Sequence, residues 1–491
     1  PNGGTPQRPN ILIIANDSLR PDHLGLSGYA RRTSPNLDRF AAQAVVFDEA
    51  YVPLARTFPS WASILTGRFP HEHGVRHMFP RHDERLDGTL TLPRYLAQEG
   101  YRTAAVADYA GDIFRRIGAG FETVQAPDFD VPSLIRQRVI QIEPALLPYL
   151  HNRLGRWLFP DLVGLVNYPH TGETMDRIGD AVDAGDGRPF FIVGFVSSSH
   201  FPYAAADPWY RRYVSPDYEG PNLYQRFRGL AETEEALAAD AAHLTDLFDG
   251  TVAWFDHEVG RLLERLEASG RLDDTVVIVT ADHGEILFEF GTTGHGDHLR
   301  GRSAHRVPLL VRDPLLTGRR VPGVVRSVDL ARTLALRATG QAPEAFGGAD
   351  LGPLLRGEQT DLGLLGYGET GLWFTPGGPE FYQHHRLPYP SLTGVAELDP
   401  HAPDEISMKP AWEDRVRVAK HRAVWDRTHK VTYMPTPTGV VVQGWRVEGG
   451  TEVEAPVRPD LKAALDAFLT EGGQARVVRG YALPVAPVAE P

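Results

Sequence analysis

The chain has 491 residues, of which 42% are hydrophobic and 23% charged, and its formal net charge is −13. This length and composition are typical of a globular protein with a large core, and acidic charge spread along the chain argues against a nucleic-acid partner, which requires a basic stripe. The absence of cysteine excludes disulfides, thiolate metal ligands and cysteine catalysis.

No run of about 18 apolar residues is present, so the sequence predicts no transmembrane segment in this chain. Residues 1–10 are polar and have the composition of a linker. The chain is therefore compatible with the soluble part of a longer anchored protein, periplasmic or extracellular, and also with a cytoplasmic protein. The sequence sets no oligomeric state, and a homo-oligomer is compatible with it.

Short apolar and β-branched runs alternate with helical patterns along the first two thirds of the chain. The strands predicted from these runs are 11–15, 45–52, 190–196 and 275–280. Residues 246–270 have apolar positions at helical spacing and predict a long amphipathic helix before the last of these strands. The alternation predicts an α/β fold with a mostly parallel central sheet flanked by helices.

The texture of the chain changes after about residue 365, where strand-like runs alternate with turn signals and 459–473 predicts a closing helix. We therefore expect a larger α/β domain over 1–365 and a small C-terminal α+β subdomain over 366–491, with an antiparallel sheet plus helix. Residues 130–168 are unusually apolar and predict an inserted helical segment. It either covers an apolar or lipid substrate or packs into the core, and the ordinary frequency of amphipathic helices favours core packing.

Polar side chains follow each predicted strand where it ends. Asp17 follows the first strand, Thr57 comes shortly after the second, His200 follows the third, and Asp282 and His283 follow the fourth. Ligands of open α/β sheets bind at the carboxyl ends of the strands. Each of these residues alone is compatible with a turn or a helix cap, but four strand ends together favour a functional site.

Two carboxylates and an imidazole, from Asp17, Asp282 and His283, suit one divalent metal ion, with Zn²⁺ or Mn²⁺ favoured over Ca²⁺ or Mg²⁺, which prefer oxygen ligands alone. Thr57 would complete the metal shell and lose its proton more readily there. Pro59 predicts the start of a helix, so its first N–H groups would face anionic oxygens of a substrate.

Several segments occur in an order that resembles one family of enzymes. These segments are PNILIIANDSLRPDHLGLSGY from residue 9, TFPSWASILTGRFPHEHGV from 57, RPFFIVGFVSSSHFPY from 188, VVIVTADHGE from 276 and HRVPLLV from 305. Together they resemble a sulfatase-type member of the alkaline phosphatase superfamily, over about residues 8 to 335. The resemblance makes 1–365 the catalytic domain.

The chain departs from that family at its catalytic positions. Sulfatases have Cys or Ser followed by x-Pro-x-Arg, and oxidise the first residue to formylglycine, whereas this chain has Thr57 and Trp61. Threonine cannot form that aldehyde. The Lys-x-His of the family is replaced by Asp108 and Ala110, and the loss of cations argues for a singly charged ester or a different leaving group.

What remains is similar to the threonine-nucleophile branch, which includes phosphodiesterases and phosphoethanolamine transferases. The resemblance makes Thr57 the nucleophile, and makes His200 and His295 the catalytic pocket histidines. His298 is the alternative to His295 and, with Arg20 and Asp108, a candidate for contacting substrate. Arg20 is equally compatible with anchoring the first ligand loop.

We therefore expect a metal-dependent hydrolase of phosphate esters, either phosphodiesters or phosphonate monoesters, that works through a covalent phospho-threonine and takes a small-molecule or lipid substrate. His200 or His295 would protonate the leaving oxygen. Phosphoryl transfer to a lipid or glycan hydroxyl is the first alternative. A sulfatase or promiscuous sulfate/phosphate esterase without formylglycine is the second. A non-catalytic relative of the fold is the third. Ser60 is a rival nucleophile, although its hydroxyl is expected to turn toward the helix backbone.

Overall fold

The computed structural model describes residues 4–5, 7–129, 153–158, 169–220, 234–373, 384–448 and 450–485. Most of the predicted inserted segment, 130–168, lies outside the described residues, and within it only a short helix, α8 (Arg153–Leu158), is described. Among the helices of the described ranges, none combines the length and apolar character that crossing a bilayer requires.

An eight-stranded sheet forms the centre of the larger part of the chain, in the order β10-β2-β9-β6-β1-β5-β3-β4. The strands are β1 (Asn10–Asn16), β2 (Val45–Tyr51), β3 (Arg102–Ala107), β4 (Thr123–Gln125), β5 (Phe190–Val196), β6 (Thr275–Thr280), β9 (Arg306–Arg312) and β10 (Arg319–Arg326). Only β9 among them runs antiparallel to its neighbours. The expected α/β fold with a mostly parallel sheet is confirmed.

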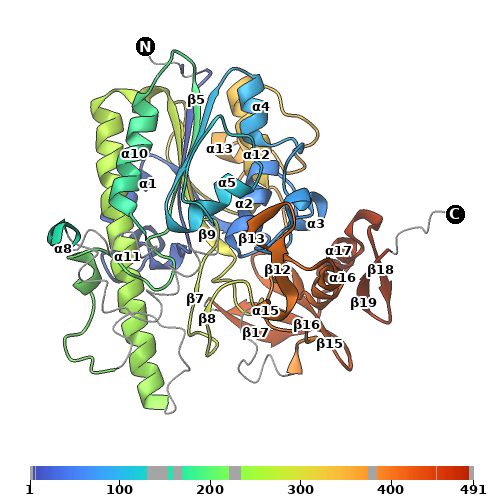
Figure 1. Ribbon diagram of the computed structural model, residues 1–491. Helices are drawn as coiled ribbons and strands as arrows, with labels where there is room; N and C mark the ends of the chain where they lie inside the picture. The colour runs from blue at the N-terminus through green and yellow to red at the C-terminus, as the bar shows by residue number, and fades with distance from the viewer. Residues whose placement is uncertain are drawn as a thin grey trace.

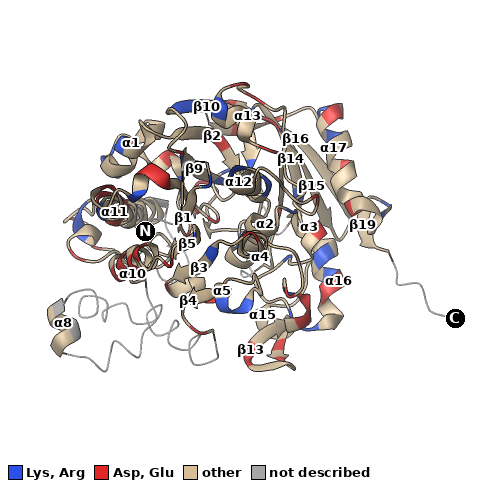
Figure 2. Ribbon diagram, turned by 90° about the horizontal axis from the view of Figure 1, so that it is seen from above, with Lys and Arg blue, Asp and Glu red and all other residues tan. Residues whose placement is uncertain are grey.

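Helices cover both faces of this sheet (Figures 1 and 2). One face carries α1 (Pro35–Ala41), α10 (Thr171–Asp183) and α11 (Glu234–Ala268), and the other carries α2 (Thr57–Thr66), α4 (Leu92–Gln98) and α12 (Asp329–Thr339). The predicted helix over 246–270 is the second half of α11. Because helices cover both faces, the central strands β1 and β6 are apolar except at their first and last residues, and all seven residues of β1 are buried.

The strand order brings the predicted polar loops together. β1 lies between β5 and β6, with Asn16 opposite Val196 and Ala15 opposite Thr280. The chain therefore leaves three adjacent strands at one edge of the sheet, just before Asp17, Ser197 and Ala281. β2 lies farther along the same sheet, beyond β6 and β9, and is parallel to β6, so the helix that follows it, α2, begins at the same edge.

The C-terminal part forms a separate five-stranded antiparallel sheet, in the order β11-β14-β15-β16-β17. Its strands are β11 (Gly366–Glu369), β14 (Arg422–Trp425), β15 (His429–Thr436), β16 (Gly439–Glu448) and β17 (Thr451–Ala455). The helices α16 (Pro410–Ala419) and α17 (Pro459–Thr470) pack against it. The first of these strands starts at Gly366, the residue from which we expected the C-terminal subdomain; the division into domains stays a prediction.

Short elements complete the described chain. The hairpins are β7 (Ile286–Leu287) with β8 (Thr293–Gly294), β12 (Ala396–Asp399) with β13 (Ala402–Met408), and β18 (Ala475–Val478) with β19 (Tyr481–Pro484). The short helices are α3 (Pro70–His73), α5 (Ile113–Arg116), α13 (Gly352–Arg356) and α15 (Leu392–Val395).

A buried ionic network joins the C-terminal sheet to the larger part of the chain. Arg76, which follows α3, donates to Glu369 of β11 through Nε at 3.0 Å and Nη2 at 2.6 Å, and its Nη1 lies 2.7 Å from Glu471 Oε1. Arg422 reaches the same Glu471 oxygen at 2.9 Å. Burial opposes ionisation of Glu369, but the charges of Arg76 and Lys420 outweigh it and hold its pKa well below the usual value. The network fixes β11 against the larger part of the chain.

Glu369→Gln tests this anchoring. We expect it to lower the free energy of unfolding by about 3 kcal/mol or more, because it leaves Arg76 buried beside an uncharged partner. Urea denaturation at neutral pH measures the change. Glu122→Gln, which removes the carboxylate of an exposed pair with Arg188, is the matched control and is expected to change stability by less than about 1 kcal/mol. Equal losses in the two variants would contradict the role of the network.

Candidate metal and hydrolytic site

Thr57 is the first residue of α2, and the helix that it begins is completely buried. Arg56 precedes it in an extended conformation, and the helix ends at Gly67, whose φ of 64° is in the left-handed region. The sequence predicts Pro59 as the first helical residue, but in the structure it is the third. Thr57 itself is only 3% exposed.

The first-turn N–H groups of α2 are less available than the sequence predicts. Ser60 N–H donates to the Arg56 carbonyl at 3.0 Å, Pro59 has no N–H, and the N–H of Phe58 lies 3.3 Å from the Met78 sulfur. The helix therefore attracts an anionic substrate mainly through the positive end of its dipole, and less through free N–H groups of its first turn. The Ser60 hydroxyl donates to the carbonyl of Asp282, and not to the backbone of its own helix as expected, so it ties α2 to the segment that follows β6.

Asp17, Asp282 and His283 come together as expected, and all three are fully buried. One ligand atom from each lies within 4.8 Å of the others. His283 Nε2 is 3.6 Å from Asp17 Oδ1, 3.4 Å from Asp282 Oδ2 and 3.5 Å from Thr57 Oγ1. Metal–ligand bonds of about 2.1 Å place tetrahedral ligands about 3.4 Å apart, and bonds of about 2.4 Å give octahedral neighbours the same spacing. The gap therefore fits a divalent ion without selecting which one.

The electrostatics of the cluster favour a bound cation. Asp17 Oδ2 and Asp282 Oδ2 are buried and have no hydrogen-bond partner among the described residues. Burial and the neighbouring charge of Asp17 raise the pKa of Asp282 well above its usual value. Burial and the proximity of His295 lower the pKa of His283, which keeps the ring neutral, the form that binds metal. These residues fit one divalent ion.

Backbone and side-chain donors bond the other oxygen, Oδ1, of each carboxylate and hold the cluster in place. Ser18 Oγ donates to Asp17 Oδ1 at 2.9 Å, and His283 N–H donates to Asp282 Oδ1 at 2.9 Å. His283 Nδ1 lies 3.0 Å from the Gly284 carbonyl, which leaves Nε2 directed at the carboxylates. Each carboxylate therefore keeps one oxygen for an ion.

Two further histidines lie next to this cluster. The ring of His295 is 4.0 Å from that of His283, centroid to centroid, and 6.0 Å from that of His200. His295 Nδ1 is 2.9 Å from Glu285 Oε2, and burial raises the pKa of Glu285 to about 7. His200 Nδ1 is 2.6 Å from the carbonyl of Phe201.

His298, the alternative pocket histidine, is used within its own loop. Its Nε2 lies 3.1 Å from Thr292 Oγ1, and its Nδ1 accepts the N–H of Arg300 at 3.2 Å. The geometry therefore favours His295 over His298 as the residue that faces the cluster. His298 as a substrate contact stays a prediction.

Asp108 and Arg20, the other substrate candidates, make contacts that position loops. Asp108 is buried and accepts N–H groups of Ser197 at 2.8 Å and His170 at 3.0 Å, so it holds the chain where it enters the loop that carries His200. Burial raises its pKa to about 7. Arg20 donates to the Glu285 carbonyl at 3.1 Å and pairs with Asp22 at 2.6 Å and with Glu289. These contacts favour the anchoring alternative for Arg20.

The sequence reasoning gave no role to Glu285 and Arg56. Glu285 was visible in the strand-end segment ADHGE, but its partner His295 is ten residues away and only the fold brings them together. Arg56 pairs with Asp297 and lies 3.3 Å from the Leu372 carbonyl of the segment that follows β11. Its position directly before Thr57 was the available signal.

Trp61, which takes the place of the family arginine, is a core residue. Its ring makes edge contacts with Phe114 and Phe195, at centroid distances of 4.9 and 5.3 Å. The substitution therefore removes a cation from the neighbourhood of Thr57 and replaces it with apolar packing.

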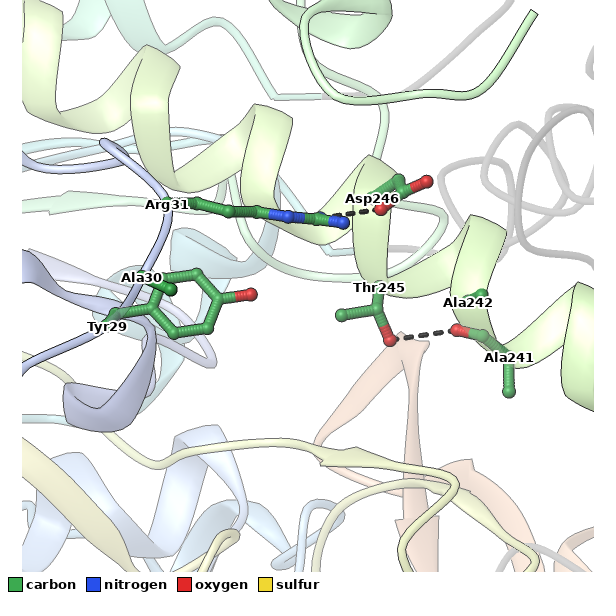
Figure 3. Close-up of a pocket in the computed structure, with 7 residues that line it drawn as sticks. All are labelled: Tyr29, Ala30, Arg31, Ala241, Ala242, Thr245 and Asp246. Carbon is green, nitrogen blue, oxygen red and sulfur yellow. Dashed lines mark hydrogen bonds and ion pairs between the residues drawn. The ribbon is translucent and has the colours of Figure 1, made fainter.

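An open pocket of about 350 Å³ lies elsewhere, between residues 29–31 and α11 (Figure 3). Arg31 points across it to Asp246, and Thr245 donates its hydroxyl to the carbonyl of Ala241. No candidate catalytic or metal residue lines it. The Tyr29 hydroxyl and Arg31 also bond Asp249, so the polar side chains of the pocket are already paired and it does not compete with the strand-end cluster as the reactive site.

The mostly parallel sheet, with three candidate metal ligands where its strands end, has the architecture of an alkaline-phosphatase-like α/β fold. The family pattern described as Sulfatase matches residues 9–340, about two thirds of the chain. The chain therefore belongs to the sulfatase family.

Individual relatives agree with this assignment. An ulvan-active sulfatase of Formosa agariphila is 26% identical over 359 residues, which are 72% of this chain and 66% of that protein. Arylsulfatase A of Bos taurus is 28% identical over 378 residues, 71% of this chain and 68% of that protein. The chain thus spans about two thirds of these curated relatives. The crystal structure of a phosphonate monoester hydrolase of Agrobacterium radiobacter matches the fold with a TM-score of 0.67 and 18% identity, over 98% of this chain and 100% of that one.

Chelation and one substitution test the metal site. We expect Zn²⁺ or Mn²⁺ to stabilise the chelated protein by about 3 kcal/mol when the free ion is about 100-fold above its dissociation constant. Asp282→Asn is expected to abolish that response and to stabilise the metal-free protein, because it removes one of two buried like charges. Urea denaturation with and without ion measures both effects.

Thr57→Ala is the matched control, because it keeps both carboxylates and His283 and should keep most of the response to the ion. Two results together would rule out the site. Asp282→Asn would destabilise the metal-free protein, and divalent ions would not stabilise the wild type.

Proposed function

We propose that this chain hydrolyses singly charged esters of phosphorus or sulfur, and that Thr57 is the nucleophile. The observation that supports this most directly is the position of the Thr57 hydroxyl, 3.5 Å from His283 Nε2, beside two buried carboxylates with free oxygens. Asp17, Asp282 and His283 would hold a divalent ion, whose positive charge would favour the ionised hydroxyl and the anionic ester.

The charge of the pocket favours a monoanion. A dication is balanced by the carboxylates of Asp17 and Asp282, His283 is neutral, and the charge of Arg56 is balanced by Asp297. The positions of the family's cations carry Asp108, Ala110 and Trp61. A site without surplus positive charge binds a dianion poorly, whereas sulfate monoesters, phosphodiesters and phosphonate monoesters each carry one charge.

The chemistry of threonine favours phosphorus over sulfur. Attack of Thr57 Oγ1 forms a phospho-threonine and breaks the bond to the leaving oxygen, which takes up a proton. An aldehyde hydrate releases its ester through a second hydroxyl on the same carbon, but threonine has none. Release therefore needs water to attack the phosphorus itself, so we favour phosphonate monoesters and phosphodiesters as substrates.

Sulfate monoesters are the second candidate, and the curated relatives support them: the relatives described above are a sulfatase of ulvan and an arylsulfatase. Transfer to a lipid or glycan hydroxyl and a lipid substrate stay predictions, as does the identity of the metal.

A panel of four esters tests the proposed function. We expect the metal-loaded protein to hydrolyse bis(4-nitrophenyl) phosphate and 4-nitrophenyl phenylphosphonate faster than the dianion 4-nitrophenyl phosphate, as measured by kcat/KM. 4-Nitrophenyl sulfate is the fourth ester, and faster turnover of it would move the assignment to the second candidate.

Thr57→Ala is expected to lower kcat by at least about 10⁴-fold, as removal of a nucleophile does. Thr57→Ser keeps the hydroxyl and is the matched control, which should retain most activity. An alanine variant as active as the serine variant would exclude Thr57 as nucleophile.

A further inference from the structure

Glu285 and His295 are held opposite each other by the backbone. β7 and β8 form an antiparallel pair in which Ile286 faces Gly294 and Leu287 faces Thr293. Continuing that register by one residue places Glu285 directly opposite His295, at the end of the hairpin nearest the metal cluster. Their hydrogen bond of 2.9 Å is therefore a product of strand register rather than of a chance side-chain conformation.

The hydrogen bond engages one nitrogen of the ring and leaves the other. Nδ1 of His295 bonds Glu285 Oε2, whereas Nε2 has no hydrogen-bond partner among the described residues. Glu285 is fully buried and His295 is 6% exposed. A buried carboxylate at Nδ1 fixes the tautomer and the plane of an imidazole.

We infer that Glu285 is a positioning residue that holds His295 so that Nε2 carries the proton between the Thr57 hydroxyl and the leaving oxygen. This inference rests on the proposed function. The bond from Thr57 Oγ1 to the central atom forms as the bond to the leaving oxygen breaks. The proton that leaves Thr57 passes to Nε2 and then to the leaving oxygen, while the Nδ1 proton stays on the ring, bonded to Glu285.

The neighbouring acidic residue provides the comparison. Glu289 lies on the same hairpin, pairs with Arg20 and accepts the N–H of Leu287 at 2.6 Å. It therefore helps to order the loop but does not touch His295. A role of Glu285 that was only structural would resemble that of Glu289.

Dependence on the leaving group distinguishes the two roles. A poor leaving group such as an alkoxide needs a proton as it departs, whereas nitrophenolate does not. We expect Glu285→Gln to lower kcat for benzyl phenylphosphonate by about 10²-fold or more, and for 4-nitrophenyl phenylphosphonate by less than about tenfold. His295→Asn should show the same difference, and Glu289→Gln should lower both rates by one common factor. Sulfate esters of the two alcohols replace the phosphonates if sulfate is the preferred class.

Equal losses for the two esters in Glu285→Gln, or no loss at all, would overturn the inference. If the glutamine variant does not fold, Glu285→Asp takes its place, because it keeps the charge. We expect it to lower kcat for the benzyl ester selectively, since its carboxylate is one methylene farther from Nδ1. An active Thr57→Ala variant would contradict the proposed function itself. If Thr57→Ala is inactive and Glu285→Gln loses activity equally on the two esters, only the inference about Glu285 fails.

Discussion

The site depends on two carboxylates that the fold forces together without enough protein charge to neutralise them. Asp17 and Asp282 follow adjacent strands whose register is fixed by buried apolar residues on both faces, so neither can move away without breaking the sheet. The third member of this cluster among the described residues is His283. Burial lowers its pKa, so its ring is neutral and does not offset the two carboxylates. A dication bound by Asp17, Asp282 and His283 would relieve this repulsion within reach of the Thr57 hydroxyl.

The surrounding structure keeps the reactive groups at this edge. Asn16 at the end of β1 bonds Ser198 and Ser199 in the loop that leads to His200, while the Ser60 hydroxyl ties α2 to the end of β6. The β7–β8 hairpin orients His295. The C-terminal sheet is fixed by the Arg76 network, and the segment after β11 reaches Arg56, the residue directly before Thr57. Each loop around Thr57 is thus held by contacts from a different part of the fold.

The sequence was sufficient for the sheet and for the proximity of Asp17, Asp282 and His283, because strands buried on both faces read as continuous apolar runs and the polar residues after them meet at one edge. It was not sufficient for Glu285, because pairing with His295 depends on the register of a two-residue hairpin that leaves almost no pattern. It also overestimated the N–H groups at the start of α2, since the Met78 sulfur next to Phe58 comes from a distant loop. Family resemblance identified the position of Trp61, but only packing shows that this residue belongs to the core.

An anomalous-scattering map from crystals grown with Mn²⁺ or Zn²⁺ tests the central claim most directly. The account predicts one strong peak about 2.0 to 2.6 Å from oxygens of Asp17 and Asp282, Nε2 of His283 and Oγ1 of Thr57. A map without a peak between these four side chains, or with an ion bound while the Thr57 hydroxyl points away from it, would contradict the account.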